Sequence, residues 1–286
     1  CVSSSFIARG QAALFGGGDD ARQLSNPIAS DLDALRPAVL PVLLAAAARG
    51  SARGLGPHHL FEIGPAFTGG APGQQQTVAA GLRAGAPPRH WRKSDDPADV
   101  FAAKADMLAT LEAVMGAPIT APVTGKTPPW YHPGRSGALA LGPKVIAQFG
   151  EIHPRVLAAY DLKGPAAGFE IFLDAIPAPR KKIKARPLFT PSPFQATLRD
   201  FAFVVDAKVA AGDIVKAARL ADRALIDTVT VFDVYEGTGV PDGHKSVAIA
   251  VRLQPKDKTL TDAEIETIAQ KIVADVSKAT GASLRN

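Results

Sequence analysis

The apolar and polar residues alternate most regularly over the last part of the chain, from Ser192 to Asn286. The pattern predicts a strand, a helix, two strands, a helix and a final strand, at residues 199–205, 212–224, 226–235, 245–253, 262–279 and 282–285. A glycine- and proline-containing turn at 236–243 separates the second and third strands. This β-α-β-β-α-β order is the split βαβ arrangement, with two helices covering one face of a four-stranded sheet.

The second predicted helix is defined by its stripe and its ends. Its apolar stripe recurs at helical spacing and consists of Ile265, Ile268, Ile272 and Val276. Thr261 followed three residues later by Glu264 predicts a capping box, and Gly281 stands where a left-handed residue ends a helix.

The strand at 245–253 has two different faces. Its odd-numbered residues from Val247 to Leu253 are apolar and are expected to pack under the helices. The other face, with Ser246, Ala248, Ala250 and Arg252, is flat, partly basic and expected to lie open. An open four-stranded face suits RNA, but RNA-recognition motifs stack bases on aromatic residues of the central strands, and this strand has none. Any RNA contact here is therefore expected through backbone and shape, and the fold alone assigns no function.

The first 178 residues read as a second domain. Strands outnumber helices and follow one another in meander order, which predicts an antiparallel sheet flanked by helices. Segment 2–7 reads as a strand that the chain enters midway, so we expect a fragment of a longer protein. The sequence thus predicts an α+β protein with domains at 1–178 and 191–286, joined by a basic, proline-rich linker at 179–190. The linker contains Lys181, Lys182 and Lys184, interpreted as solvated, with contact to RNA phosphates as the alternative.

Composition limits the classes of function. With 32 Lys and Arg against 27 Asp and Glu, the net charge of +5 is only mildly basic, which suits an accessory RNA contact rather than binding by charge alone. The single cysteine excludes a disulfide framework and indicates a reducing compartment, so a cytoplasmic location is expected. The chain has no apolar run long enough for a membrane span, and neither a membrane nor DNA is expected as a partner.

Several segments could suggest chemistry but are better interpreted as structure. The glycine run at 16–18 lacks the Lys-Ser/Thr of a phosphate-binding loop, and the turn containing His58, His59 and Glu62 lacks a fourth metal ligand. The segments around His132 and His153 lack the spacing of a hydrolase triad and are interpreted as turns. We therefore assign no catalytic residue and no metal ligand.

Six phrases of the last domain resemble one known family. In order they are Pro193-Phe194, Arg199-Asp200-Phe201-Ala202, Phe232-Asp233-Val234-Tyr235, Lys245-Ser246-Val247-Ala248, Thr259-Leu260-Thr261-Asp262 and Gly281-Ala282-Ser283-Leu284-Arg285. Together they resemble the ferredoxin-fold anticodon-binding domain at the C-terminus of phenylalanyl-tRNA synthetase. The resemblance implies contact with the anticodon stem of phenylalanine tRNA. We select Arg199, Lys245, Arg252 and Arg285 as candidate RNA contacts, although Arg199 could equally pair with Asp200 or Asp233 inside the fold.

The first domain resembles the same family. The phrases are Asn26-Pro27-Ile28, Leu35-Arg36-Pro37, Leu60-Phe61-Glu62-Ile63-Gly64, His132-Pro133-Gly134-Arg135, Gly150-Glu151-Ile152-His153-Pro154 and Phe169-Glu170. They look like the class II synthetase-like domain of the bacterial β subunit. The resemblance implies an α2β2 assembly with an α subunit, phenylalanine tRNA as a partner, and ATP and Mg²⁺ used by the holoenzyme but not bound by this fragment.

A class II active site needs fixed cations beside the triphosphate of ATP, and the family supplies an arginine in each of two motifs. Aligned by eye, those arginines fall on Glu62 and Ile171, and neither segment has an arginine nearby. A carboxylate repels phosphate and an isoleucine compensates no charge. We therefore expect a non-catalytic scaffold. An active single-chain synthetase of the organellar type and a non-synthetase regulator on a class II fold are the alternatives.

Overall fold

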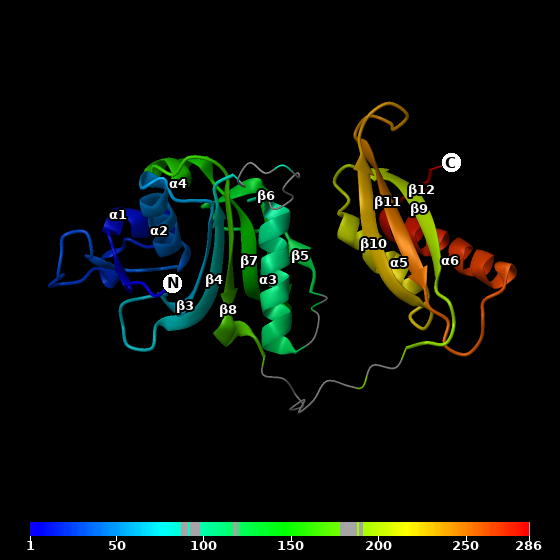
Figure 1. The fold of residues 1–286 in the computed structure, drawn as a ribbon, viewed down its shortest axis with the longest axis horizontal. Coiled ribbons are helices and arrows are strands. Elements are labelled where there is room, and N and C mark those ends of the chain that lie inside the picture. Colours follow the sequence, from blue (N-terminus) through cyan, green and yellow to red (C-terminus); the bar gives the residue numbers. More distant parts are fainter. Residues whose placement is uncertain are drawn as a thin grey trace. The chain divides into compact units, whose positions relative to one another are not determined.

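The computed structural model describes residues 1–86, 91, 98–116, 119, 121–177, 188 and 191–285 (Figure 1). The chain divides into two compact units, Cys1–Lys184 and Ala185–Asn286, which we describe separately. None of the helices in these described ranges is both long enough and apolar enough to cross a bilayer.

The first unit contains a six-stranded antiparallel sheet, in the order β3-β4-β8-β7-β6-β5. The strands are β3 (His58–Phe67), β4 (Gln75–Ala84), β5 (Val123–Thr124), β6 (Tyr131–Leu141), β7 (Lys144–Ile152) and β8 (Ala166–Phe172). The predicted antiparallel sheet is therefore confirmed.

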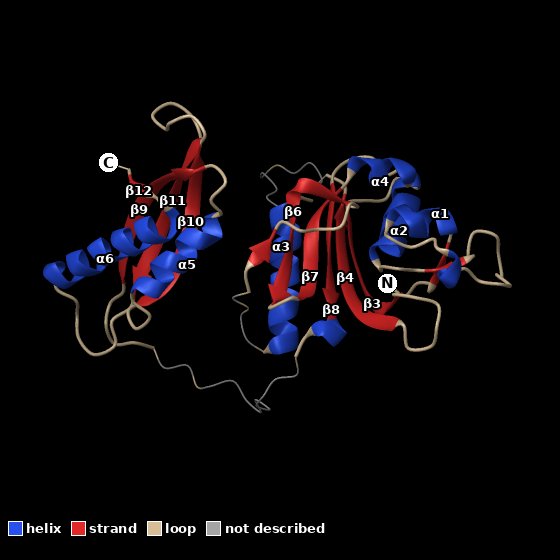
Figure 2. Cartoon of the chain, turned by 180° about the vertical axis from the view of Figure 1, so that it is seen from behind, coloured by secondary structure: helices blue, strands red, loops and turns tan. Residues whose placement is uncertain are grey.

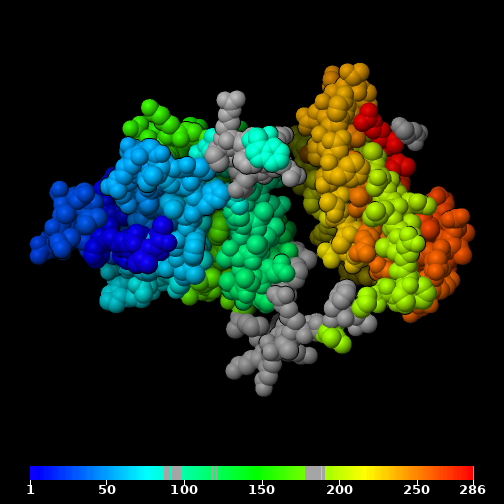
Figure 3. Space-filling model, viewed as in Figure 1, coloured from blue at the N-terminus to red at the C-terminus, as the bar shows by residue number. Residues whose placement is uncertain are grey.

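Helices cover both faces of this sheet, so it separates two cores. Helix α2 (Leu40–Ala52) packs on one face with the short helices α1 (Arg9–Leu14) and α4 (Pro154–Ala159). Helix α3 (Val100–Met115) covers β7 and β8 on the other face (Figure 1). Its Met107 and Leu111 are fully buried. The outer side of α3 forms part of the protein surface (Figure 3).

One strand of the first unit is shorter than the sequence predicts. The strand expected at 2–7 is only β1 (Phe6–Ile7), which pairs with β2 (Ala34–Leu35). The unit also contains the 3-10 turns η1 (Asp20–Arg22) and η2 (Leu173–Ala175). Asp99 caps α3 by accepting a hydrogen bond from the amide of Ala102. An acidic residue at the N-cap stabilises the helix in two ways, because it accepts from a free amide and interacts favourably with the positive end of the helix dipole.

The second unit has the predicted β-α-β-β-α-β order. Its elements are β9 (Thr197–Asp206), α5 (Ala211–Ala221), β10 (Ile226–Tyr235), β11 (His244–Leu253), α6 (Asp262–Thr280) and β12 (Ser283–Leu284), and the strand order is β10-β11-β9-β12. Both helices lie on one face of the sheet, which Figure 2 shows from the helix side. Figure 1 shows the other face, which no helix of the second unit covers.

The alternation along β11 is confirmed. Val247, Ile249 and Val251 are fully buried against the helices, whereas Arg252 is exposed. Ser246 is the exception on the face expected to be open, since only 4% of it is exposed. Its cross-strand neighbours are Tyr235 and Val204, and these larger side chains flank the small serine.

The ends of α6 also follow the prediction. Thr261 accepts a hydrogen bond from the amide of Glu264, and the Glu264 carboxylate accepts one from the amide of Thr261 at 2.9 Å, which completes the capping box. Gly281 ends the helix with a φ of 70°, a left-handed conformation that glycine adopts at no steric cost.

Candidate nucleic-acid interface and the synthetase-like core

The face of the second sheet opposite the helices, here called the open face, carries two of the four RNA contacts predicted in the second unit. Arg252 lies at one end, where its guanidinium forms a 2.7 Å ion pair with Asp227 and bonds Gln254. Both members of the ion pair are about half exposed, with side-chain exposures of 46% and 41%. Water screens such a pair, so a phosphate can compete with Asp227 for the guanidinium.

Arg285 lies near the other end of the open face and contacts an aromatic ring. Its guanidinium carbon is 5.4 Å from the centre of the Tyr235 ring, a cation–π distance. Tyr235 ends β10, whereas Arg285 follows β12 and donates its amide to the carbonyl of Ala202 on β9. An aromatic ring and a guanidinium thus meet above the two central strands, and both offer flat surfaces on which a base can stack.

The other two predicted contacts lie on the helix side of the sheet. Arg199 pairs across the strands with Val251, and Lys245 with Val205, both of which are buried under the helices. The ammonium group of Lys245 donates to the carbonyl of Ala207 at 2.8 Å. Arg199 does not pair with Asp200 or Asp233, because the register places these carboxylates on the open face.

Aromatic residues are therefore available near the open face, although its central strand β11 has no Phe, Trp or Tyr. Tyr235 is 39% exposed and Phe232, at the bulge where β10 shifts register, is 58% exposed. Both belong to the edge strand β10 and not to the central strands. The predicted contacts Lys181, Lys182 and Lys184 lie outside the described residues.

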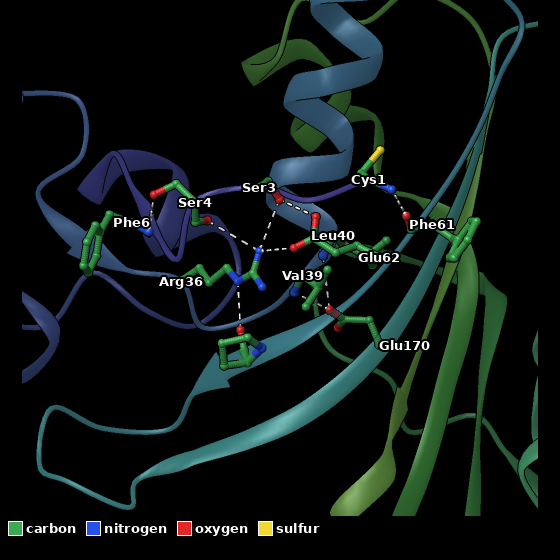
Figure 4. Close-up of polar contacts among 11 residues, drawn as sticks. Cys1, Ser3, Ser4, Phe6, Arg36, Val39, Leu40, Phe61, Glu62 and Glu170 are labelled. Atoms are coloured by element: carbon green, nitrogen blue, oxygen red, sulfur yellow. Dashed lines mark hydrogen bonds and ion pairs between the residues drawn. The ribbon is translucent and has the colours of Figure 1, made fainter.

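The first unit has a buried polar cluster around Glu62, one of the two positions on which the alignment by eye places a motif arginine. Arg36 is 1% exposed and forms a 2.7 Å ion pair with Glu62, which is 4% exposed (Figure 4). Arg36 also donates to the carbonyl of Pro65, and Ser3 donates to the other oxygen of Glu62. The sequence segment around Glu62 has no arginine, but the fold brings one to it. Arg36, 26 residues earlier in the chain, donates a hydrogen bond to Glu62, so the expectation that no arginine lies near Glu62 is wrong.

A second buried carboxylate holds the start of helix α2. One oxygen of Glu170, on β8, accepts hydrogen bonds from the amides of Val39 and Leu40 at 2.7 and 3.2 Å (Figure 4). Its other oxygen accepts from Gln148 at 3.0 Å. Burial raises the pKa of Glu170, while these hydrogen bonds oppose the shift. Because Val39 has no capping side chain, Glu170 supplies the acceptor that the first turn of α2 needs.

This cluster does not fit ATP and Mg²⁺. The charge of Arg36 is already balanced by Glu62, Glu170 adds a second carboxyl group, and Ile171 is fully buried. Among the residues that the structure describes, no group of three or more His, Cys, Asp or Glu side chains is placed to hold a metal ion. A triphosphate placed here would meet carboxylates without compensating cations, which is unfavourable in a buried setting.

Comparisons with known proteins identify the class and then the family. Residues 192–285 match the family described as "Ferredoxin-fold anticodon binding domain", which gives the class of the second unit. Residues 1–173 match "Phenylalanyl tRNA synthetase beta chain CLM domain". The chain belongs to the phenylalanyl-tRNA synthetase β-chain family.

Curated relatives agree over the whole chain. The chain is 54% identical over 287 residues to the "Phenylalanine--tRNA ligase beta subunit" of Rhodospirillum rubrum, covering 100% of this chain and 36% of that protein. It is also 54% identical to the protein of that name in Paramagnetospirillum magneticum, covering 99% and 36%. The chain therefore spans about a third of the length of these relatives. Pyrrolysyl-tRNA synthetase from Desulfitobacterium hafniense is a weak structural match, with a TM-score of 0.43 and 15% identity over 61% of this chain and 60% of that one.

Proposed function

We propose that this chain is the part of a phenylalanine–tRNA ligase β subunit that contacts phenylalanine tRNA through the open face of its second unit. The observation that carries the proposal is the Tyr235–Arg285 pair, which presents an aromatic ring beside a cation on a sheet face without covering helices. Base stacking on an aromatic ring contributes about 1–3 kcal/mol, and arginine can add phosphate contacts. Arg252 contributes a further cation at the opposite end of the same face.

The geometry divides the four predicted contacts into two pairs, which gives matched controls. Arg252 and Arg285 belong to the open face, whereas Arg199 and Lys245 share the helix side. We therefore propose the first pair and Tyr235 as the tRNA contacts and withdraw Arg199 and Lys245 from the direct interface. All four substitutions to alanine remove one positive charge, so they change the long-range field by similar amounts.

The test is filter binding of phenylalanine tRNA to the purified chain and to variants of it. Tyr235→Ala and Arg285→Ala are each expected to weaken binding by about tenfold, which corresponds to ~1.4 kcal/mol. Arg199→Ala and Lys245→Ala are expected to weaken it by less than about threefold, through charge alone. Equal losses in both sets would show that the open face is not the binding surface.

We propose that the first unit is a non-catalytic scaffold that assembles with an α subunit, while ATP and Mg²⁺ act in that subunit. The neutralised Arg36–Glu62 pair and the buried Glu170 support this reading, because among the described residues this cluster offers a triphosphate a balanced cation and an additional carboxyl group. ATP–pyrophosphate exchange by the purified chain alone should be absent, and measurable exchange would contradict the proposal. Co-purification with a co-expressed α subunit tests the assembly independently.

The linker lysines provide a separate test. We propose a domain organisation of 1–178, 179–190 and 191–286, in which Lys181, Lys182 and Lys184 are placed next to the tRNA-facing unit in sequence. Replacing the three lysines with glutamine should reduce the slope of log binding constant against log salt by about 2–3 if all contact phosphates. An unchanged slope would assign them to solvent.

A further inference from the structure

The segments around His132 and His153 meet at one end of the first sheet. Strand β6 bulges strongly there: between the pairs Tyr131–Ile152 and Ser136–Gly150, the four residues 132–135 face only Glu151. The bulge is fixed by Ser136, whose hydroxyl donates to the carbonyl of His132 at 2.7 Å. The imidazoles of His132 and His153 then stack, with ring centres 6.5 Å apart and planes 28° from parallel.

Both histidines use the same ring nitrogen for local structure. Nδ1 of His132 accepts the amide of Gly134, and Nδ1 of His153 accepts the amide of Arg155, each at 3.1 Å. In a neutral imidazole whose Nδ1 accepts, the proton resides on Nε2. Each ring is half-buried. The local turn uses Nδ1 of each ring, and the N–H donor of Nε2 takes no part in it.

An arginine follows each histidine closely in the sequence, Arg135 after His132 and Arg155 after His153. Arg135 forms a 2.6 Å ion pair with Glu151, which balances its charge. Arg155 donates one N–H to the carbonyl of Pro129 and, within the described part of the chain, has no carboxylate partner. The cluster therefore combines two Nε2–H donors with one uncompensated guanidinium.

We propose that this cluster, His132, His153 and Arg155 with Arg135 at its edge, is a binding site for a phosphate group. Phosphate accepts several hydrogen bonds at once, and its oxygens can bridge donors about 5–8 Å apart when each bond is ~2.8 Å long. A metal ion fits less well, because the Nε2 atoms carry protons and no third ligand of the usual kind is available among the described residues. The site lies on the first unit and does not depend on the open face of the second.

The two turns use only Nδ1 of each histidine and do not need the Nε2–H donor. A substitution can therefore remove the donor and keep the turn. The oxygen of asparagine can replace Nδ1 as the acceptor of the local amide, but its side chain is too short to replace the outer Nε2–H. The double variant His132→Asn/His153→Asn should therefore keep both turns and lose the donors. His244→Asn is the control in the other unit. Nδ1 of His244 donates to a local carbonyl, that of Asp242, and the amide nitrogen of asparagine can take over this contact.

The experiment follows the imidazole nitrogens of the full chain by long-range ¹H–¹⁵N NMR at about pH 8, where free imidazoles are neutral. Inorganic phosphate and pyrophosphate are titrated at constant ionic strength, with chloride as the reference. We expect saturable shifts of the His132 and His153 Nε2 signals, and at least tenfold weaker binding in the double variant and in Arg155→Gln. Uniform shifts that match those in chloride, or unchanged binding in both well-folded variants, would overturn the site.

A second arm identifies the source of the phosphate. If the double variant loses affinity for pyrophosphate but binds phenylalanine tRNA as tightly as the original chain, the ligand is a free phosphate compound. If tRNA affinity also falls while His244→Asn retains it, the site contacts the tRNA backbone. Since the open-face variants leave this cluster intact, failure of the tRNA proposal would not alter the pyrophosphate result.

Discussion

The guanidinium of Arg285 lies 5.4 Å from the centre of the Tyr235 ring, although Tyr235 ends one edge strand of the second sheet and Arg285 follows the other. The contact therefore spans the two central strands, and it sits directly over the open face. Gly239 belongs to the turn after β10 and lies close to the same guanidinium, since an added Cβ there would be 3.6 Å from it. The turn, the ring and the C-terminal arginine together shape one end of the proposed tRNA surface.

This pair predicts a difference between ring loss and hydroxyl loss. Tyr235→Phe removes only the 3.3 Å hydrogen bond from the hydroxyl to the carbonyl of Thr238, so tRNA affinity should change less than about twofold. Tyr235→Leu removes the stacking surface and the cation–π contact, worth ~0.5–1 kcal/mol at an exposed site. Filter binding of both variants, combined with Arg285→Ala in a double-mutant cycle, measures the coupling. Additive losses would show that ring and guanidinium act independently.

The buried Arg36–Glu62 pair predicts that the free energy of unfolding depends strongly on both partners. Arg36→Met should lower the free energy of unfolding by about 3–5 kcal/mol, because it leaves Glu62 buried without a cation. The double variant Arg36→Met/Glu62→Met should cost clearly less than the sum of the single changes. Guanidinium unfolding of the chain gives these values. Arg135→Met, in a pair with side-chain exposures of 52% and 23%, is the control and should cost less than about 1 kcal/mol.

Local patterns in the sequence were sufficient for most of the second unit. The odd-numbered apolar residues of β11 specified its buried face, and Thr261, Glu264 and Gly281 specified the ends of α6. The same parity argument places Lys245 with Val247, on the helix side. Lys245 was selected as a candidate RNA contact without reference to this signal, and the same holds for Arg199, which shares its parity with Phe201.

Such local patterns do not predict contacts between segments that are distant in the sequence. Arg36 stands in an apolar run, where a buried arginine requires a partner, but nothing local indicates Glu62 on β3. Likewise, the Tyr235–Arg285 contact depends on the strand order β10-β11-β9-β12, which brings the two edge strands to one face. The bulge that stacks His132 on His153 depends on the register between β6 and β7. Pairing of strands, rather than composition, creates each of these sites.

The contacts of Glu170 predict that the start of α2 needs a hydrogen-bond acceptor rather than a negative charge. Glu170→Ala removes the acceptor for the amides of Val39 and Leu40, and each buried donor left without a partner costs about 1–3 kcal/mol. Glu170→Gln keeps an oxygen in place, and Gln148 can turn its own oxygen towards the new amide group. It should therefore cost much less than Glu170→Ala in guanidinium unfolding. Equal costs would show that the negative charge itself is required.

The capping box of α6 predicts acid sensitivity of the second unit. The 2.5 Å contact with Lys258, together with hydrogen bonds from Thr261, lowers the pKa of Glu264 from its ordinary 4.5 to about 2. Because the folded-state pKa lies below the unfolded one, this contribution to stability is present above pH 4.5 and is lost as the pH falls towards 2. Carboxyl ¹³C NMR of the chain should show the depressed titration of Glu264, and Lys258→Met should move its pKa back towards 4.5. Glu264→Gln should flatten the pH dependence of thermal unfolding in this range. An unchanged profile would show that the ionised carboxylate adds nothing to the cap beyond its oxygen acceptor.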